Sequence, residues 1–312
     1  MSRVENASAA QPSQHSATRC GLVAVVGAPN AGKSTLVNAL VGQKVAIVSP
    51  KAQTTRAKLL GVAIQDDVQL LLVDTPGIFD PRRRLDRAMV AAAWGGTEGA
   101  DVLAFVVDAK GGLPPKVIEI AETLKDRREP VYLILNKVDV ADKPKLLLHA
   151  ERLNAIAPFA ETFFVSATTG DGVAELKNAL AAAMPAGPWL YPEDQVSDAT
   201  ERALAAEVTR EQLYLQLHAE LPYASVVETE KFEDREDGSA EIHQQILVER
   251  PTQRAIVLGK GGARIRDIGA RARAELAALW GRPVHLYLHV KVKPGWDEDR
   301  GVYRDIGLDW VD

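Results

Sequence analysis

The stretch GAPNAGKST (residues 27–35) follows the apolar run GLVAVV and precedes LVNALVG, so a buried strand leads into a glycine-rich turn and then a helix. Gly27 and Gly32 allow the backbone to curve around an anion and point several N–H groups at it, and the helix N-terminus adds partial positive charge. In this P-loop pattern Lys33 reaches the β- and γ-phosphates of a nucleotide, and the Ser34 hydroxyl binds Mg²⁺. A simple glycine turn accounts for neither Lys33 nor Ser34. The stretch therefore predicts a site for nucleotide phosphates and Mg²⁺.

Length and composition indicate two domains. The chain has 312 residues, of which 46% are hydrophobic, enough to bury a core in each domain. Apolar runs such as VLAFVV (residues 102–107) are far shorter than the roughly 20 residues that cross a bilayer. Residues 1–19 are rich in Ser, Ala and Gln and lack the apolar core of a signal peptide, so we expect a disordered tail. The single cysteine, Cys20, excludes an internal disulfide framework and favours a reducing cytosol.

Short apolar runs alternate with helical stretches in the first half of the chain. Strands are expected near residues 22–26, 69–74, 102–108, 131–137 and 162–167, and helices near residues 36–41, 117–127 and 173–183. This alternation predicts an α/β domain with a mostly parallel sheet and helices on both faces. Residues 184–198 contain three prolines and no periodicity, which predicts an interdomain linker anchored by Trp189 and Tyr191. The predicted domains are therefore residues 20–183 and 199–312.

Two further motifs indicate which nucleotide the phosphate site holds. DTPG (residues 74–77) ends the run QLLLV, which puts Asp74 at the carboxyl edge of the sheet, where it can hold Mg²⁺ through water. The Gly77 N–H can bind a γ-phosphate and sense its loss. NKVD (residues 136–139) ends the run VYLIL, and the Asp139 carboxylate can accept two hydrogen bonds from guanine, whereas adenine would leave it unpaired. The pocket is therefore predicted to bind GTP and GDP and to reject ATP.

SAT (residues 166–168) ends the next strand and could offer the Ala167 N–H to the guanine carbonyl. Each motif alone is compatible with an ordinary loop, but their order, each at a strand end, is the signature of a GTP-binding switch protein. The predicted GTP-binding residues are Gly27, Ala28, Pro29, Asn30, Ala31, Gly32, Lys33, Ser34, Thr35, Asp74, Thr75, Pro76, Gly77, Ile78, Asn136, Lys137, Val138, Asp139, Ser166, Ala167 and Thr168.

With QTTR (residues 53–56) between the P-loop and DTPG, these elements resemble the translation-factor class of bacterial GTPases. Thr55 is the predicted second hydroxyl ligand of Mg²⁺ beside Ser34, and Thr54 is the competing candidate. A surface threonine pair at a strand edge, with no metal role, is the alternative.

The residue after DTPG bears on hydrolysis. Ras-like enzymes have a glutamine there that orients the attacking water, whereas the Ile78 side chain cannot form a hydrogen bond. We therefore expect slow intrinsic hydrolysis, with water positioned by backbone groups, a monovalent cation or a partner. Related GTPases with asparagine in the P-loop can coordinate K⁺, so Asn30 is either a K⁺ ligand or a residue that caps the turn. The candidates for a catalytic role are Asn30, Thr55 and Gly77.

The second half of the chain has a different element order. It is predicted as a helix, two strands, a short helix, a turn, a long helix and a strand, over residues 199–218, 225–232, 242–250, 252–259, 259–262, 263–280 and 284–292. This order resembles a type II KH domain, an α+β fold whose Gly-x-x-Gly loop clamps about four nucleotides of single-stranded RNA.

Charge supports an RNA site around the turn GKGG. Residues 251–293 carry nine Lys or Arg and two acidic residues, a local charge of +7, although the whole chain carries −5. The predicted RNA-binding residues are Gly259, Lys260, Gly261, Gly262, Arg264 and Arg266, with Ile256, Ile265 and Ile268 as an apolar platform for bases.

The motifs KAQTTR, DTPG, NKVD, LPY, ILVER, GKGG and KVKPGW occur in this order, and from Cys20 onward the chain closely resembles the Era family of bacterial GTPases. The resemblance implies single-stranded RNA near the 3′ end of the small-subunit (16S) ribosomal RNA as a partner. It also implies a role in rRNA processing and small ribosomal subunit assembly. It further implies a cytoplasmic protein with peripheral association at the inner membrane, and we expect a monomer. Two departures are the extra glycine of GKGG and SAT in place of the commoner SAK.

A switch is the expected mechanism: GTP and Mg²⁺ order the loops around Thr55 and Gly77 and change how the two domains pack. Two other functions stay open. The first is a GTPase that acts on a protein or membrane partner, with the C-terminal domain as a docking module. The second is a P-loop ATPase, which Asp139 disfavours.

Overall fold

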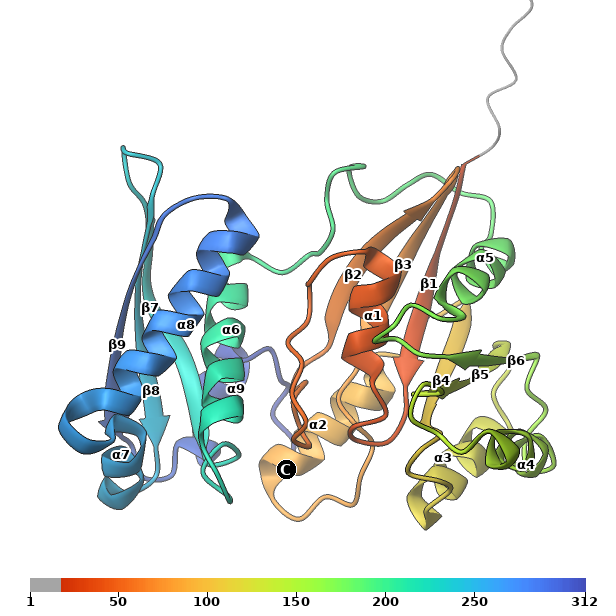
Figure 1. Cartoon of the computed structure of the whole chain (residues 1–312), viewed down its shortest axis with the longest axis horizontal. Helices are drawn as coiled ribbons and strands as arrows, with labels where there is room; N and C mark the ends of the chain where they lie inside the picture. The colour runs from red at the N-terminus through yellow and green to blue at the C-terminus, as the bar shows by residue number, and fades with distance from the viewer. Residues whose placement is uncertain (1–17) are drawn as a thin grey trace, which may run out of the picture.

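A computed structural model describes residues 18–312, which form two domains side by side (Figure 1). The N-terminal domain contains one sheet of six strands, β1 (Arg19–Val26), β2 (Leu59–Gln65), β3 (Val68–Asp74), β4 (Val102–Asp108), β5 (Val131–Asn136) and β6 (Glu161–Val165). The strands lie in the order β2-β3-β1-β4-β5-β6, and all neighbours are parallel except β2 and β3. The predicted mostly parallel sheet is confirmed.

Helices cover both faces of this sheet, as expected for strands that are apolar throughout. On one face α1 (Lys33–Val41) and α5 (Val173–Ala183) bury an aliphatic cluster. On the other face lie α2 (Arg84–Gly95), α3 (Pro115–Leu124) and α4 (Lys143–Asn154). All parallel strands point their carboxyl ends toward the same edge, so the loops that carry GKST, DTPG and NKVD meet there.

Some predicted boundaries are wrong. Residues 1–17 of the predicted tail lie outside the described residues, but Arg19 begins β1 and pairs with Val68 of β3. Its guanidinium Nε donates to the Met184 carbonyl at 2.8 Å, so Arg19 is part of the sheet. The predicted helix over residues 117–127 ends at Leu124. Strand β2 and helices α2 and α4 were not predicted.

The C-terminal domain contains the elements expected from its sequence. These are α6 (Glu201–Gln216), β7 (Ser225–Asp234), β8 (Ala240–Val248), α7 (Pro251–Leu258), the short 3-10 turn η1 (Lys260–Gly262), α8 (Ala263–Trp280) and β9 (Val284–Val292). β8 is antiparallel to β7 and parallel to β9. Helices α6 and α8 pack on one face of the sheet and bury its apolar side chains, so the predicted α+β order is confirmed.

The segment between the domains, residues 184–198, follows the edge of the first sheet. The Val62 amide donates to Val196 at 2.8 Å, which covers part of the edge strand β2. The Trp189 indole N–H donates to the Asp67 carbonyl at 3.2 Å. Tyr191 is held through its backbone, because its carbonyl accepts from Gln69 at 2.8 Å.

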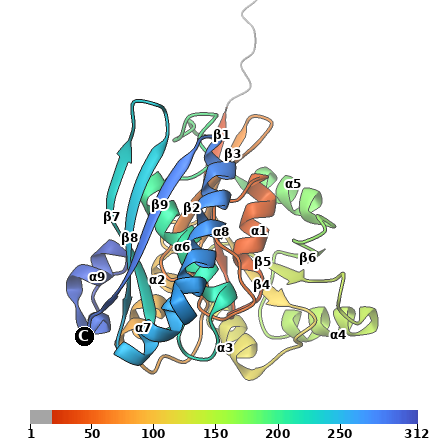
Figure 2. The same cartoon turned by 60° about the vertical axis from the view of Figure 1, so that its left-hand side comes forward.

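After β9 the chain returns to the N-terminal domain through η2 (Trp296–Glu298) and α9 (Arg300–Asp305). Figure 2 shows α9 beside β7, and the last residues lie against α2 in Figure 1. Tyr303 and Leu308 share a buried cluster with Leu85 and Met89 of α2. Across residues 18–312, no helix has the length and apolar character needed to span a membrane.

Candidate functional site

The P-loop has a backbone shape that requires glycine. Gly27 (φ 153°) and Gly32 (φ 93°) have positive φ, and a Cβ on either would overlap neighbouring atoms of Val106 or Asn136. Lys33 is 6% exposed and donates through Nζ to the Gly27 carbonyl (3.2 Å) and the Ala28 carbonyl (3.1 Å). Burial lowers the pKa of Lys33 to about 8, and the nearby Asp74 charge opposes this shift. A buried ammonium held over this loop is suited to bind a phosphate anion.

Three side chains gather where a metal ion is expected. The Asp74 Oδ2 atom accepts hydrogen bonds from Ser34 Oγ (2.6 Å) and Thr55 Oγ1 (3.1 Å), and the two hydroxyl oxygens lie 2.8 Å apart. Asp74 is fully buried, its Oδ1 atom has no hydrogen-bond partner among residues 18–312, and burial raises its pKa. Two hydroxyls and a carboxylate oxygen without a partner form an all-oxygen donor set that fits Mg²⁺.

The same geometry separates the two candidate threonines. Thr54 Oγ1 lies 2.8 Å from Ser49 Oγ and donates to the Lys51 carbonyl at 2.7 Å, so it is engaged within its own loop. Only Thr55 reaches Ser34 and Asp74.

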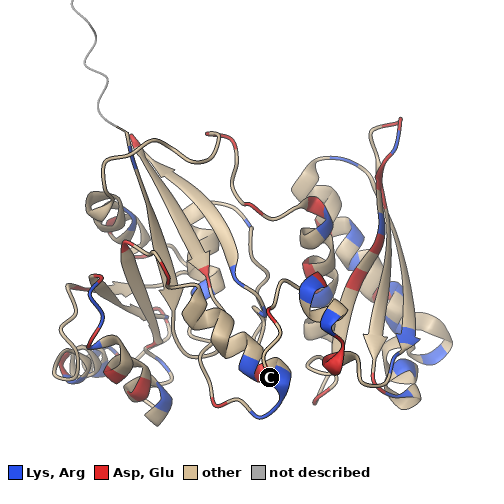
Figure 3. Cartoon of the chain, turned by 180° about the vertical axis from the view of Figure 1, so that it is seen from behind, with Lys and Arg blue, Asp and Glu red and all other residues tan. Residues whose placement is uncertain are grey.

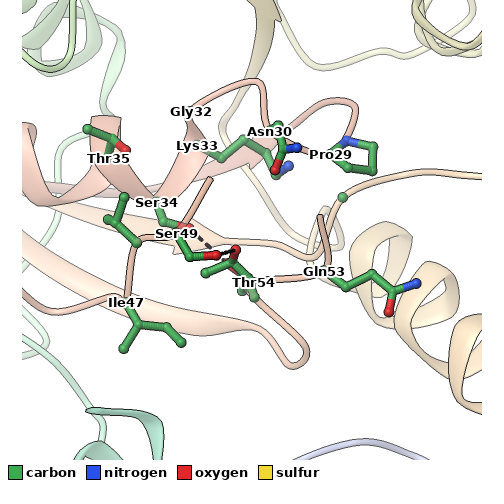
Figure 4. A pocket seen from close by; sticks show the side chains of 13 residues that line it. Pro29, Asn30, Gly32, Lys33, Ser34, Thr35, Ile47, Ser49, Gln53 and Thr54 are labelled. Atoms are coloured by element: carbon green, nitrogen blue, oxygen red, sulfur yellow. Dashed lines mark hydrogen bonds between the residues drawn. The ribbon is translucent and has the colours of Figure 1, made fainter. Parts of the chain in front are cut away.

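The loop that carries QTTR covers the phosphate site, and its first part, residues 44–50, was not assigned from the sequence. Figure 4 shows Pro29, Asn30 and Lys33 of the P-loop on one side of a small cavity and Ile47 and Thr54 on the other. We call residues 44–58 the switch segment. Its apolar start, KVAIV, looks like part of a strand, and no sequence signal marked it as a cover for the site.

Asn136 links the NKVD loop to the P-loop and to the SAT loop, at the end of the site where the guanine base is expected. Its Nδ2 donates to the Ala31 carbonyl at 2.9 Å, and its Oδ1 accepts from the Ala167 N–H at 3.0 Å. The Ala167 N–H, expected to serve the guanine carbonyl, is thus already bonded to Asn136. The Lys137 Nζ donates to the Asn30 carbonyl at 2.7 Å, which ties NKVD to the P-loop again.

The remaining predicted nucleotide residues differ in exposure. Asp139 and Thr168 are exposed, whereas Ser166 is buried. Thr75 is buried and donates through Oγ1 to the Val25 carbonyl at 2.7 Å, so its hydroxyl links the end of β3 to β1. Ile78 is 5% exposed and packs in the core, which keeps its side chain away from any attacking water. Thr35, Pro76 and Val138 are partly or fully buried in the loops around the site.

Gly77 packs directly against the P-loop. A Cβ at this position would lie 2.8 Å from Pro29 Cα, so only glycine lets DTPG approach this closely. The adjacent Ile78 N–H donates to the Gly27 carbonyl at 3.0 Å, which fixes Gly77 beside the phosphate site.

The loop GKGG has three glycines with positive φ, Gly259 (70°), Gly261 (59°) and Gly262 (75°). Lys260 and Arg266 are exposed, and Arg264 donates to the Ile256 carbonyl at 2.9 Å. In Figure 3 the blue Lys and Arg segments gather on α7 and α8 at the lower right, whereas β7 carries several red segments.

One apolar assignment is corrected. Ile268 is fully buried in the domain core, so it cannot contact bases. Ile256 is 48% exposed and stays available beside the loop, while Ile265 is partly buried.

Comparison with known proteins agrees with this geometry. Residues 22–137 match the family model described as "50S ribosome-binding GTPase", and residues 220–297 match the model described as "KH domain". GTPase Era of Erythrobacter litoralis is 61% identical over 298 residues, which cover 94% of this chain and 98% of the relative. GTPase Era of Afipia carboxidovorans is 56% identical over 94% of this chain and 95% of the relative.

Two solved structures have the same arrangement of both domains. One is Era in complex with MgGDPNP and nucleotides 1506–1542 of 16S ribosomal RNA, and it is 37% identical with a TM-score of 0.88. The other is a variant of Aquifex aeolicus Era bound to GDP and AlF4⁻, again 37% identical with a TM-score of 0.88. Each match covers 93% of this chain and 99% of the other. The chain therefore belongs to the Era family of GTPases.

Proposed function

We propose that this protein is a GTP-dependent switch that binds the 3′ region of 16S rRNA and assists rRNA processing and assembly of the small ribosomal subunit. One observation carries the proposal: a GTPase site with the Ser34, Thr55 and Asp74 oxygen cluster and a KH loop occur in one chain. That chain superimposes over 93% of its length on an Era bound to MgGDPNP and 16S rRNA.

The chain's own residues supply binding and orientation for hydrolysis. The P-loop N–H groups and Lys33 hold the phosphates, and the Gly77 N–H is placed to sense the γ-phosphate. Mg²⁺ held by Ser34 and Thr55, and by Asp74 through water, would neutralise charge that develops on the phosphate oxygens. Because the Ile78 side chain is buried, water must be oriented by backbone groups, a monovalent cation or a partner, and we expect slow hydrolysis in the isolated protein.

The KH domain is proposed to clamp single-stranded RNA along GKGG. Lys260 and Arg266 are exposed beside the loop and can pair with phosphates, which carry no sequence information. The exposed Ile256 offers an apolar surface for a base.

The test is a pair of titrations with fluorescent guanine nucleotide and with a short RNA from the 3′ end of 16S rRNA, each with and without the other ligand. We expect tighter RNA binding with a GTP analogue than with GDP. RNA affinity that is equal in both states would contradict the switch, because a ligand with no differential affinity shifts no equilibrium. A Lys260→Ala/Arg266→Ala variant should lose salt-sensitive RNA binding and keep nucleotide binding. Its unchanged RNA affinity would favour a protein partner for this domain.

Finer parts of the proposal have separate tests. K⁺ coordination by Asn30 predicts faster GTP hydrolysis in KCl than in NaCl, lost in Asn30→Ala. Peripheral association with the cytoplasmic face of the inner membrane, expected only from the family resemblance, predicts co-flotation with anionic vesicles. A monomer is expected in solution and is tested by light scattering. Failure of any of these leaves the GTPase assignment unchanged.

A further inference from the structure

Helix α6 of the KH domain contacts the backbone of the switch segment just before Thr55. The Arg210 guanidinium donates to the Thr54 carbonyl, and the Tyr214 hydroxyl donates to the Gln53 carbonyl at 3.1 Å. Arg210 is 2% exposed and Tyr214 is fully buried. Both bonds are therefore shielded from water, and each fixes a main-chain group rather than a movable side chain.

Arg56, the residue after Thr55, inserts its guanidinium into the KH domain. Its Nη1 donates to the Ser225 carbonyl at 2.9 Å and its Nη2 to the Pro222 carbonyl at 3.3 Å. The residue is only 3% exposed. A buried guanidinium is stable only with hydrogen-bond partners, so these carbonyls tie the residue after Thr55 to the KH domain.

The attachment continues along the segment. Lys51 donates to the Leu217 carbonyl at 2.6 Å, at the C-terminal end of α6. The Val48 N–H donates to the Glu211 carboxylate at 2.7 Å, and Glu211 and Glu275 both pair with Lys44. The loop over the nucleotide phosphates is therefore held to the other domain from Lys44 to Arg56.

Behind Thr55 the two domains do not pack tightly. A cavity of about 370 Å³ lies between Ile47, Thr55 and Asp74 on one side and Ala203 and Glu207 of α6 on the other. The contact of the segment with α6 depends on these polar anchors, whereas Ala57 packs against the apolar cluster that joins α2 to the KH sheet and the C-terminal segment. The segment can therefore separate from α6 without breaking either domain's core.

From this geometry we propose that Arg56, Arg210 and Tyr214 are positioning residues for Thr55, so that the KH domain holds one of the Mg²⁺ ligands in place. The inference rests on the proposed function, because it requires that Thr55 binds Mg²⁺ in the GTP state. The Arg210 bond fixes the Thr54 carbonyl and so the peptide unit before Thr55, and the buried Arg56 side chain holds the residue after it, so that together they restrict the position of the Thr55 backbone. Helix α6 is then part of the nucleotide site although it contacts no nucleotide.

The arrangement couples RNA binding by the KH domain to Mg²⁺ binding in the GTP state. If RNA binding changes the position of the KH domain, it moves the anchors and alters Mg²⁺ affinity in the GTP state. By linkage, Mg²⁺ with GTP must change RNA affinity by the same factor. GDP binding does not depend on Thr55 and should be insensitive to the anchors.

The experiment measures Mg²⁺ titrations of GTP-analogue and GDP binding in the full-length protein and in two variants. Tyr214→Phe keeps the buried ring and removes the bond to Gln53 and the hydroxyl that accepts from Arg56 Nη2, and Arg56→Lys keeps the charge and loses the forked contact. We expect the apparent Mg²⁺ affinity with the GTP analogue to fall by on the order of tenfold in each variant. GDP affinity should change by less than about twofold, since Thr55 is not its ligand.

Two control variants lose similar groups away from these contacts. Tyr303→Phe removes a hydroxyl that donates to the Asp297 carbonyl at 2.8 Å in the C-terminal segment. Lys58→Gln removes an exposed charge within the switch segment. Both should titrate like the unmodified protein, and thermal melts of all variants check that they are folded.

The outcomes are distinct. If the two variants lose apparent Mg²⁺ affinity with the GTP analogue and keep their affinity for GDP, the positioning role is supported. Unchanged Mg²⁺ titrations in Tyr214→Phe and Arg56→Lys, with an unmodified protein that binds GTP and RNA, would overturn it and leave the proposed function intact. An unmodified protein that binds no guanine nucleotide would instead remove the proposed function itself.

Discussion

The side-chain amide of Asn136 donates to the Ala31 carbonyl at 2.9 Å, which ties the strand end that carries NKVD to the P-loop. In Asn136→Asp a carboxylate oxygen would face this carbonyl, which removes the bond and adds repulsion. Loss of a buried hydrogen bond of this kind costs roughly 1–3 kcal/mol, so guanine nucleotide affinity should fall by about 10-fold or more. The measurement is a fluorescent GDP titration. Asn154→Asp is the control, because Asn154 donates to the Ala150 carbonyl at 2.9 Å on an exposed helix face. Equal losses of guanine nucleotide affinity in Asn136→Asp and Asn154→Asp would contradict the role of Asn136 in holding the P-loop.

Asp139 should decide which base is bound. Asp139→Asn replaces one acceptor by an amide donor, which suits the 2-oxo group of xanthine and not the 2-amino group of guanine. We expect GTP affinity to fall and XTP affinity to rise in competition assays. The neighbouring exposed residue Asp142 provides the control Asp142→Asn, which should keep GTP preference. Unchanged preference in Asp139→Asn would favour a site that does not read guanine.

Gly259 and Gly261 predict different results for the same substitution. Gly259 has φ 70° and ψ 175°, a conformation that is almost exclusive to glycine, and its Cβ would lie 2.8 Å from Arg264 Cβ. Gly261 has φ 59° and ψ 24°, and its Cβ would meet no atom of the described part of the chain within 4 Å. Gly259→Ala should therefore distort the loop and abolish RNA binding, whereas Gly261→Ala should cost about 1 kcal/mol of stability and reduce RNA binding less. RNA anisotropy and thermal melts separate the two. Equal RNA affinities would contradict a role for the Gly259 conformation.

The charged partners of Glu241 on the outer face of the KH sheet predict that the stability of the protein depends on pH. Glu241 accepts hydrogen bonds from Arg235 Nε (2.8 Å), His243 Nε2 (2.7 Å) and Lys231 Nζ (3.1 Å), which lower its pKa to about 2. The folded state binds a proton less readily than the unfolded state, whose pKa is near 4.5. This stabilisation is therefore present above pH 4.5 and is lost as the pH falls toward 2.

The check is the difference in unfolding free energy between the unmodified protein and Glu241→Gln, from urea melts at several pH values. The difference should be constant above about pH 5 and shrink in acid. Glu161→Gln, at an exposed position of β6, controls for loss of a charge. If the difference in unfolding free energy stays constant down to pH 2.5, the lowered pKa of Glu241 is contradicted.

Local signals in the sequence predicted the elements that depend on local chemistry. Helix α8 and strand β9 have the predicted bounds, because glycines flank the helix and apolar residues alternate along the strand. Helix α4 was missed since only Leu146 and Leu153 of its apolar residues are buried, and Leu147 and Leu148 point outward, which erases the helical pattern. Strand β2 was missed because it lies at an edge and contains Gly61.

The sequence could not predict contacts between the domains. Nothing in KAQTTR distinguishes Thr54 from Thr55, and the choice depends on which hydroxyl meets Asp74 once the segment is attached to α6. Arg56 looks like a solvated charge in the sequence, yet it is buried against carbonyl groups more than 150 residues away. Ile268 similarly looks like a groove residue until the packing of α8 against α6 puts it in the core.

The return of the C-terminal residues to α2 bears on how the protein can be labelled. The Arg84 guanidinium lies 4.3 Å from the centre of the Trp310 ring, two residues from the end of the chain. An affinity tag or fluorescent fusion at the C-terminus would therefore crowd the helix that follows DTPG and could disturb the nucleotide response. A label joined before Arg19 enters at the opposite edge of the sheet from the P-loop and is the better choice.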